Sequence, residues 1–165
     1  MAPLSTTVGV AAAASIVASG WSSGMGFGLS FFGIPTILNG HTSSEVMIRQ
    51  WRYQFLRGQA IMPGLAALNA VNFWAVAYHC YSHGLEWRGF AEAGASVFFI
   101  IPFTLMFIMD TNKQLLAEHD SKVKSMGEGT VKSLIQKWGY LNVVRAVVPL
   151  LGTVPALGNL ALYCM

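Results

Sequence analysis

Four long apolar stretches divide the chain. They run from Val8 to Leu38, from Ile61 to Cys80, from Phe90 to Met109 and from Trp138 to Tyr163. About 20 predominantly apolar residues in helical conformation cross the ~30 Å hydrocarbon core of a bilayer, and each stretch reaches about that length. The pattern therefore predicts an all-α, multi-pass integral membrane protein in which residues 1–165 form a single four-helix transmembrane domain.

The composition agrees with this interpretation. Hydrophobic residues make up 54% of the chain and charged residues 10%, whereas an average soluble domain has about 25% charged residues. The isoelectric point near 9.0 would suit a nucleic-acid binder. However, the basic residues form no stripe beside a nucleic-acid-binding motif, so we expect membrane lipid and no nucleic acid as a partner.

The basic residues predict the topology. Eight of the ten Lys and Arg residues lie in two polar segments: Arg49, Arg52 and Arg57 in the first, and Lys113, Lys122, Lys124, Lys132 and Lys137 in the second. By the positive-inside rule both segments face the cytoplasm, and both termini and the 81–89 connection face the lumen or exterior. The N-terminus lacks the basic region of a secretory signal. We therefore expect a retained first helix and an internal membrane such as the endoplasmic reticulum.

The first polar segment has the pattern of a separate helix. Thr42-Ser43-Ser44-Glu45 matches a capping box, which predicts a helix start. Apolar residues alternate with the arginines up to Arg57, which predicts an interfacial amphipathic helix between the first and second spans, joining the second near residues 58–63. The segment from Thr111 to Lys137 is expected to extend the third span as a helix and then to form a mobile loop.

Small residues and cysteines suggest how the helices pack. Gly20, Gly24 and Gly28 recur every four residues, which predicts a face that another helix approaches closely, and a kink is expected before Pro35. Cys80 and Cys164 end the second and fourth spans on the same side. They form either a disulfide bond or two buried small apolar side chains.

Polar residues inside spans are candidates for function because their burial in lipid is costly. Arg145 lies about two turns into the last span, with Asn142 and Trp138 on its face, and Asn69 and Asn72 are expected to offer it carbonyl acceptors. The alternative is that the Arg145 side chain extends to the interface.

A second group lies where the third span ends. Asp110 and Asn112 are expected at the same level as Arg57 and Trp138, which predicts a polar cluster around an opening at the cytoplasmic end. The alternative is a solvated helix end. At the opposite end, His79 and His83 are four residues apart on a helix and could bind a metal together, but a solvated helix terminus is the favoured interpretation.

Several short patterns together resemble a known family. They are Trp51 with Arg57-Gly58 and Pro63, then Pro102-Phe103-Thr104 with Thr111-Asn112 and Leu115-Leu116, then Trp138 with Asn142 and Arg145. In this order and spacing, the chain resembles the fungal anthrone oxygenases, a family of small four-helix membrane proteins. The resemblance implies oxidation of an aromatic polyketide, an anthrone similar to emodin anthrone, to the anthraquinone with O2.

The implied chemistry assigns roles to the candidates. Deprotonation of the anthrone gives an anthrolate that reacts directly with O2, so no cofactor is required. Arg145 would stabilise the anion, with Asn142 and Asn112 as hydrogen-bond donors and Trp51 and Trp138 as aromatic walls. Arg57, Asn69, Asn72 and Asp110 complete the expected substrate-binding set. His41 is the expected base, since a histidine ordinarily titrates at a pKa of about 6.5; Asp110 would have to be buried to replace it.

A non-enzymatic membrane adaptor or scaffold is the competing hypothesis. Its glycine face would bind a partner, or a second copy in a homo-oligomer, and its basic segments would contact anionic lipid. Arg145 favours the enzyme, whereas the lack of an evident base favours the adaptor.

Overall fold

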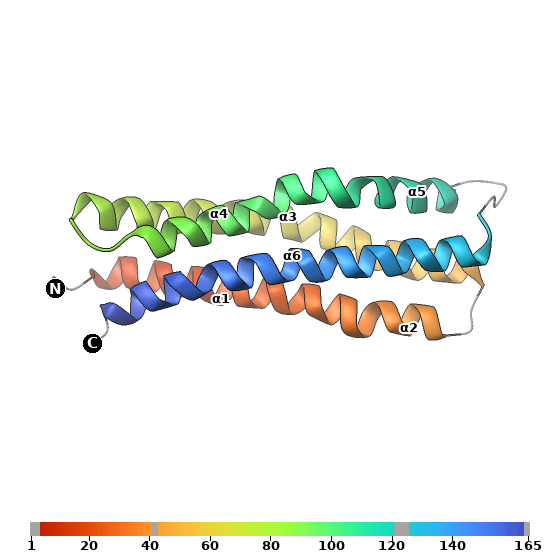
Figure 1. Cartoon of the computed structure of the whole chain (residues 1–165), viewed down its shortest axis with the longest axis horizontal. Helices are drawn as coiled ribbons and strands as arrows, with labels where there is room; N and C mark the ends of the chain where they lie inside the picture. Colours follow the sequence, from red (N-terminus) through yellow and green to blue (C-terminus); the bar gives the residue numbers. More distant parts are fainter. Residues whose placement is uncertain (1–3, 41–42, 121–125, 164–165) are drawn as a thin grey trace.

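The fold is a bundle of four long helical rods lying side by side (Figure 1). The computed structural model describes residues 4–40, 43–120 and 126–163, and this part of the chain contains no strand. The helices are α1 (Thr6–Gly28), η1 (Leu29–Gly33), α2 (Ile34–Asn39), α3 (Ser44–Ser82), α4 (Arg88–Phe103), η2 (Thr104–Ile108), α5 (Met109–Asp120) and α6 (Glu128–Leu162). Because α1–η1–α2 and α4–η2–α5 are continuous, the rods number four, and each is long and apolar enough to cross a membrane. The predicted all-α integral membrane bundle is confirmed.

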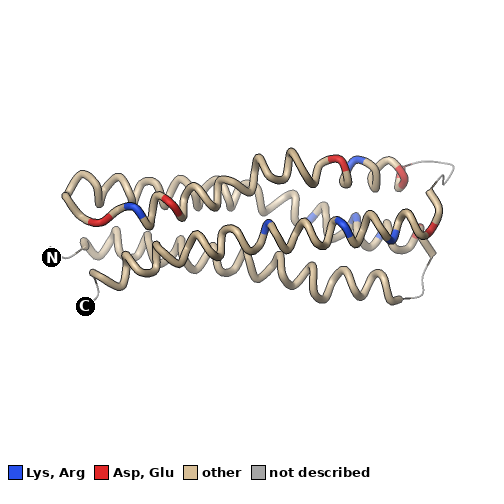
Figure 2. Tube along the Cα trace, in the orientation of Figure 1, with Lys and Arg blue, Asp and Glu red and all other residues tan. Residues whose placement is uncertain are grey.

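The rods are longer than the predicted spans and contain 33 to 39 residues. At 1.5 Å per residue, a helix of this size reaches about 50–60 Å and extends well beyond the ~30 Å hydrocarbon core. Most Lys and Arg residues lie at the end of the bundle opposite the two termini (Figure 2). We call this the basic end. The described Lys and Arg residues of both basic segments therefore lie at one end, as the predicted topology requires, while the side of the membrane that this end faces stays a prediction.

The expected interfacial helix between the first two spans is not a separate element. Residues from Ser44 onward form the first turns of α3, which continues without interruption past Pro63 to Ser82. Thr42 lies outside the described residues, and the N-cap position is Ser43, whose side chain makes no capping hydrogen bond. The segment is amphipathic because one face, with Met47 and Trp51, packs inside the bundle. The amphipathic pattern was correct, and its apolar face packs inside the bundle.

Within the bundle, the predicted glycine face is not the packing face of α1. A Cβ atom added to Gly20, Gly24 or Gly28 would have no neighbour within 4 Å, so this face does not contact the bundle. The buried residues of α1 are Ala12, Ser15, Ser19, Ser23 and Gly26. At Gly26 an added Cβ would lie 2.8 Å from the Cβ of Ala146 on α6, so the close helix approach occurs there.

Each of two rods contains a π-helical segment next to a proline. η1 ends immediately before α2, whose second residue is Pro35, where the sequence predicted a kink. η2 begins two residues after Pro102. Proline lacks an N–H group and disturbs the regular hydrogen-bond ladder, so wider turns are expected near it. Such turns occur frequently at functional sites.

The buried apolar core has two parts. The terminal-end cluster contains Ala12, Ala66, Ala70, Phe73, Val76, Ala77, Cys80, Phe90, Ala93, Val97 and Ala156. The basic-end cluster contains Ile34, Ile37, Met47, Ile48, Trp51, Phe103, Ile108, Leu115, Val131, Ile135 and Trp138. Between Trp51 and Ala66 no residue of α3 is buried. The rods are therefore tightly packed at both ends, and α3 is loosely packed between them.

Two predictions involve residues outside the described part of the chain. Cys80 is fully buried, whereas Cys164 lies outside the described residues, so a bridge between them stays a prediction. The loop expected after the third span includes residues 121–125, which also lie outside the described part. On the opposite side, α3 ends at Ser82 with His83 as its C-cap, and Gly84 takes a positive φ of 68° that starts the turn towards α4.

Candidate active site

A chain of hydrogen bonds joins four of the predicted site residues. The indole Nε1 of Trp138 donates to Oδ1 of Asn112 at 2.9 Å. Asn142 donates its side-chain amide to the backbone carbonyl of Trp138 at 2.7 Å, and Arg145 donates from its guanidinium to Oδ1 of Asn142 at 2.5 Å. The polar residues thus connect α5 with the middle of α6 through the interior of the bundle.

The helical repeat and close packing position this chain. Trp138, Asn142 and Arg145 follow one another at intervals of four and three residues, so they share one face of α6. On the adjoining face the hydroxyl of Ser30 in η1 donates to the carbonyl of Gly139 at 3.0 Å. Because Asn142 is fully buried and its amide is held at both ends, the Arg145 guanidinium has a fixed anchor.

Trp51 completes an aromatic group beside the chain. Its ring meets Trp138 edge to face, with centroids 6.0 Å apart, and stacks on Phe55 at 5.1 Å. The Trp51 Nε1 and the Thr111 hydroxyl are buried, and neither has a hydrogen-bond partner among the described residues. Most buried polar atoms in proteins are paired, so these two mark places where a polar ligand or water is expected. The sequence placed Thr111 in the family pattern but gave it no site role, because a threonine near a helix end is ordinary.

Arg145 lies between the two core clusters. On α6 it follows Trp138 of the basic-end cluster and precedes Ala156 of the terminal-end cluster. Its side chain is half-buried, and it forms no ion pair with a described carboxylate. A cation at this depth is costly unless it is paired or binds an anion. The arrangement therefore suits the binding of an anionic group at the level where α3 has no buried residue.

Other predicted residues lie away from this chain. Arg57 is exposed and stacks over the ring of Tyr53, with 4.7 Å from its guanidinium carbon to the ring centroid, and Asp110 is exposed at the start of α5. Asn69 and Asn72 use their amides to bind α1: each donates to a serine hydroxyl, at 2.9 Å and 2.6 Å respectively. Their described hydrogen bonds therefore join helices and do not reach Arg145.

The described histidines do not join the hydrogen-bonded chain of Asn112, Trp138, Asn142 and Arg145 either. His41 lies outside the described residues. His79 and His83 stack with their centroids 4.2 Å apart, and Nδ1 of His83 lies 2.8 Å from the carbonyl oxygen of His79. In the described part of the chain, no group of three His, Cys, Asp or Glu side chains is arranged to hold a metal ion.

Comparison with known proteins identifies the family. A model of the anthrone oxygenase family matches residues 51–155, which include Trp51, Asn112, Trp138, Asn142 and Arg145. The chain belongs to the anthrone oxygenase family. The similarity therefore covers the whole hydrogen-bonded chain and the π-helical segment η2.

Named fungal relatives match over most of the chain. An anthrone oxygenase, dmxR16, of Cryptosporiopsis sp. (strain 8999) is 30% identical, over 89% of this chain and 85% of the relative. The monooxygenase hypC of Dothistroma septosporum is 32% identical, over 80% and 72%. A noranthrone monooxygenase of Aspergillus flavus is 28% identical, over 85% and 68%. No solved structure matches the chain.

Proposed function

We propose that this protein is a membrane-bound oxygenase that converts a polyketide anthrone, similar to emodin anthrone, to the anthraquinone with O2. Its family and its relatives named anthrone oxygenase or noranthrone monooxygenase support this reaction. The observation in the structure that supports it most is Arg145, a half-buried cation with no ion-pair partner among the described carboxylates, held by Asn142 inside the bundle.

The reaction needs a stabilised carbanion. Removing a proton from the methylene between the two aryl rings gives an anthrolate, which transfers one electron to O2. The resulting radicals combine to a peroxide at the same carbon, and loss of water leaves the carbonyl, so one oxygen atom ends in the quinone and the other in water. Because the electron-rich anthrolate reduces O2 directly, we propose that no cofactor takes part.

The residues of the hydrogen-bonded chain have matching roles in this proposal. Arg145 stabilises the anthrolate oxygen, since a fixed positive charge in a water-poor site lowers the energy of an anion. Asn142 keeps the guanidinium in place, and Trp51 and Trp138 offer aromatic surface to the rings. His41 remains the proposed base; Asp110 is a poorer candidate because it is exposed.

The direct test is turnover of emodin anthrone by the purified protein in detergent, followed by quinone absorbance against the spontaneous oxidation rate in air. With 18O2 we expect one labelled atom in the new quinone carbonyl, and metal analysis of the active sample should find no stoichiometric metal. A rate equal to the spontaneous rate would contradict the function. Activity that depends on a bound metal would contradict the cofactor-free mechanism alone.

The proposal extends to the membrane location and the oligomeric state of the protein. We place the protein in the endoplasmic reticulum or another internal membrane, the default for a multi-pass protein with fungal relatives. A homo-oligomer is supported by the face of Gly20, Gly24 and Gly28, which is free of contacts within the described bundle.

A further inference from the structure

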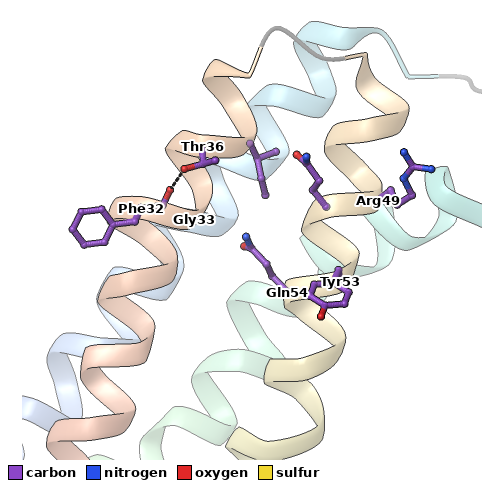
Figure 3. Close-up of a pocket in the computed structure, with 8 residues that line it drawn as sticks. Phe32, Gly33, Thr36, Arg49, Tyr53 and Gln54 are labelled. Carbon is purple, nitrogen blue, oxygen red and sulfur yellow. Dashed lines mark hydrogen bonds between the residues drawn. The ribbon is translucent and has the colours of Figure 1, made fainter.

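A groove opens on the side of the bundle between the η1–α2 segment and the first turns of α3 (Figure 3). Its volume is about 600 Å³, and Gly33, Thr36, Ile37, Arg49, Tyr53 and Gln54 contribute to its lining. Pockets for small molecules typically measure about 300–1,000 Å³. The groove is therefore large enough for a compact organic ligand.

Gln54 gives the groove a specific polar group. Its side chain points from α3 towards the turn that contains Gly33 (Figure 3). A Cβ atom on Gly33 would lie 3.2 Å from both amide atoms of Gln54, so the missing side chain leaves room for the amide. The amide Oε1 is buried and has no hydrogen-bond partner among the described residues. Gln54 also lines the groove, so its amide is the polar group that a ligand hydroxyl would meet there.

The groove lies where the apolar part of the bundle begins. The last charged residue before the membrane-spanning part of α3 is Arg57, and Arg49 on the groove rim is exposed without an ion pair among the described carboxylates. Ile37 supplies apolar wall. An amphipathic molecule at the membrane interface would therefore meet a charged group at the rim and an apolar wall inside the groove. Gln54 follows Trp51 by three residues, about one helical turn, so the groove adjoins the aromatic group beside the hydrogen-bonded chain.

We infer that this groove receives and holds the anthrone as a planar polyphenol from the membrane interface, with the Gln54 amide bonded to a phenolic hydroxyl. The inference rests on the proposed function and assigns its substrate entrance. A lipid acyl chain is the competing occupant, but it carries no hydroxyl for the buried amide. Acidic phenols also suit the unpaired Arg49 charge at the rim.

Three variants test the inference: Gln54→Leu removes the amide at similar size, Gly33→Leu fills the groove, and Gln59→Leu is the control. Gln59 is exposed on the same helix and does not line the groove. Anthrone kinetics give kcat and KM separately, and emodin binding, followed by quenching of tryptophan fluorescence, needs no turnover. Thermal unfolding of each purified variant verifies that it is folded.

For Gln54→Leu we expect kcat/KM to fall about tenfold with kcat changed less than about twofold, and emodin binding to weaken similarly. Gly33→Leu should lower kcat/KM further, and Gln59→Leu should keep the kcat/KM of the wild type. Wild-type kcat/KM in both folded groove variants would overturn the inference and leave a lipid-filled crevice, while the proposed function would stand. A wild-type protein that binds emodin through Gln54 yet does not oxidise anthrone would support the groove and refute the proposed function.

Discussion

The contacts of Arg145 do not account for its half-buried charge unless a ligand is bound. Its guanidinium is anchored by Asn142, yet no described carboxylate balances its charge. A side chain placed only for solubility would reach the interface instead of bonding inward. An anion that forms during the reaction would balance the charge only when it is needed.

Replacing this charge should therefore affect catalysis more than folding. Arg145→Met should lower the anthrone oxidation rate about 10²-fold, equivalent to about 3 kcal/mol, because it removes one charge-assisted contact to the anion. Arg145→Lys should recover only part of the rate, since an ammonium group lacks the planar paired donors of guanidinium. Steady-state turnover measures both, with Arg88→Met, at an exposed arginine near the other end, as the control. Wild-type turnover in a folded Arg145→Met variant would exclude the role.

The Trp138–Asn112 hydrogen bond allows a second prediction. Both side chains are buried, so Asn112→Leu leaves the indole N–H unpaired and should lower the free energy of unfolding by about 1–3 kcal/mol. Adding Trp138→Phe removes the unpaired donor, so the double variant should be more stable than the sum of the single effects. Unfolding in mixed micelles with increasing SDS gives the free energy of unfolding of the wild type, the two single variants and the double variant. Strictly additive losses would show that the bond contributes nothing.

The sequence identified the members of this chain because polar residues are rare within spans. Arg145, Asn142, Trp138 and Asn112 each interrupt or flank an apolar run at helical spacing. Gln54 gave no such signal, because a glutamine between arginines in an amphipathic segment is typical of a solvated face. Its burial depends on Gly33 in another helix, and only the packed structure brings the two together.

Among the helices, α1 shows how spacing alone can mislead. Glycines at 20, 24 and 28 have the small-residue spacing of a packing face, but so do Ser15, Ser19 and Ser23, which are the residues that pack. The two faces differ only in what lies opposite them. On the packed face, Asn69 and Asn72 of α3 donate hydrogen bonds to Ser19 and Ser15. A single sequence does not encode that pairing in a visible pattern.

A matched pair of glycine substitutions on α1 tests the packing. Gly26→Ala should destabilise the protein by about 1–3 kcal/mol, because its Cβ would lie 2.8 Å from the Cβ of Ala146 and the helices must separate. Gly24→Ala meets no atom within 4 Å and should be neutral or stabilise the helix by up to about 1 kcal/mol. Unfolding in SDS mixed micelles gives both values. Equal effects would argue against the described α1–α6 contact.

For the whole molecule, length and charge were enough to predict the architecture, since four apolar runs leave few alternatives in a bilayer. They did not predict how far the rods extend beyond the hydrocarbon core. The buried side chains of Met47, Ile48 and Trp51 pack the first turns of α3 into the bundle. The sequence of these turns alone would fit a helix lying on the membrane surface equally well.

The orientation in the membrane follows from the basic end and can be measured. In a protein without native cysteines, Gly127→Cys at the basic end should react with an impermeant maleimide from the cytoplasmic side of sealed vesicles. Ser82→Cys, at the end of α3, should react only after permeabilisation. The opposite labelling pattern would invert the topology. Reaction of both from one side would contradict the four-span arrangement.

The two-part core also sets how the molecule can deform. α3 has buried residues near each of its ends, and between Trp51 and Ala66 its residues are only partly buried or exposed. A rod held at both ends bends most easily in its middle, and Pro63 lies in that stretch without a backbone N–H to resist bending. Bending of α3 would therefore open the bundle on the α3 side at the level of Arg145, while α1 and α6 stay packed at Gly26 and Ala146. A flat tricyclic substrate would enter by that side, and its quinone product would leave the same way, without unpacking either cluster.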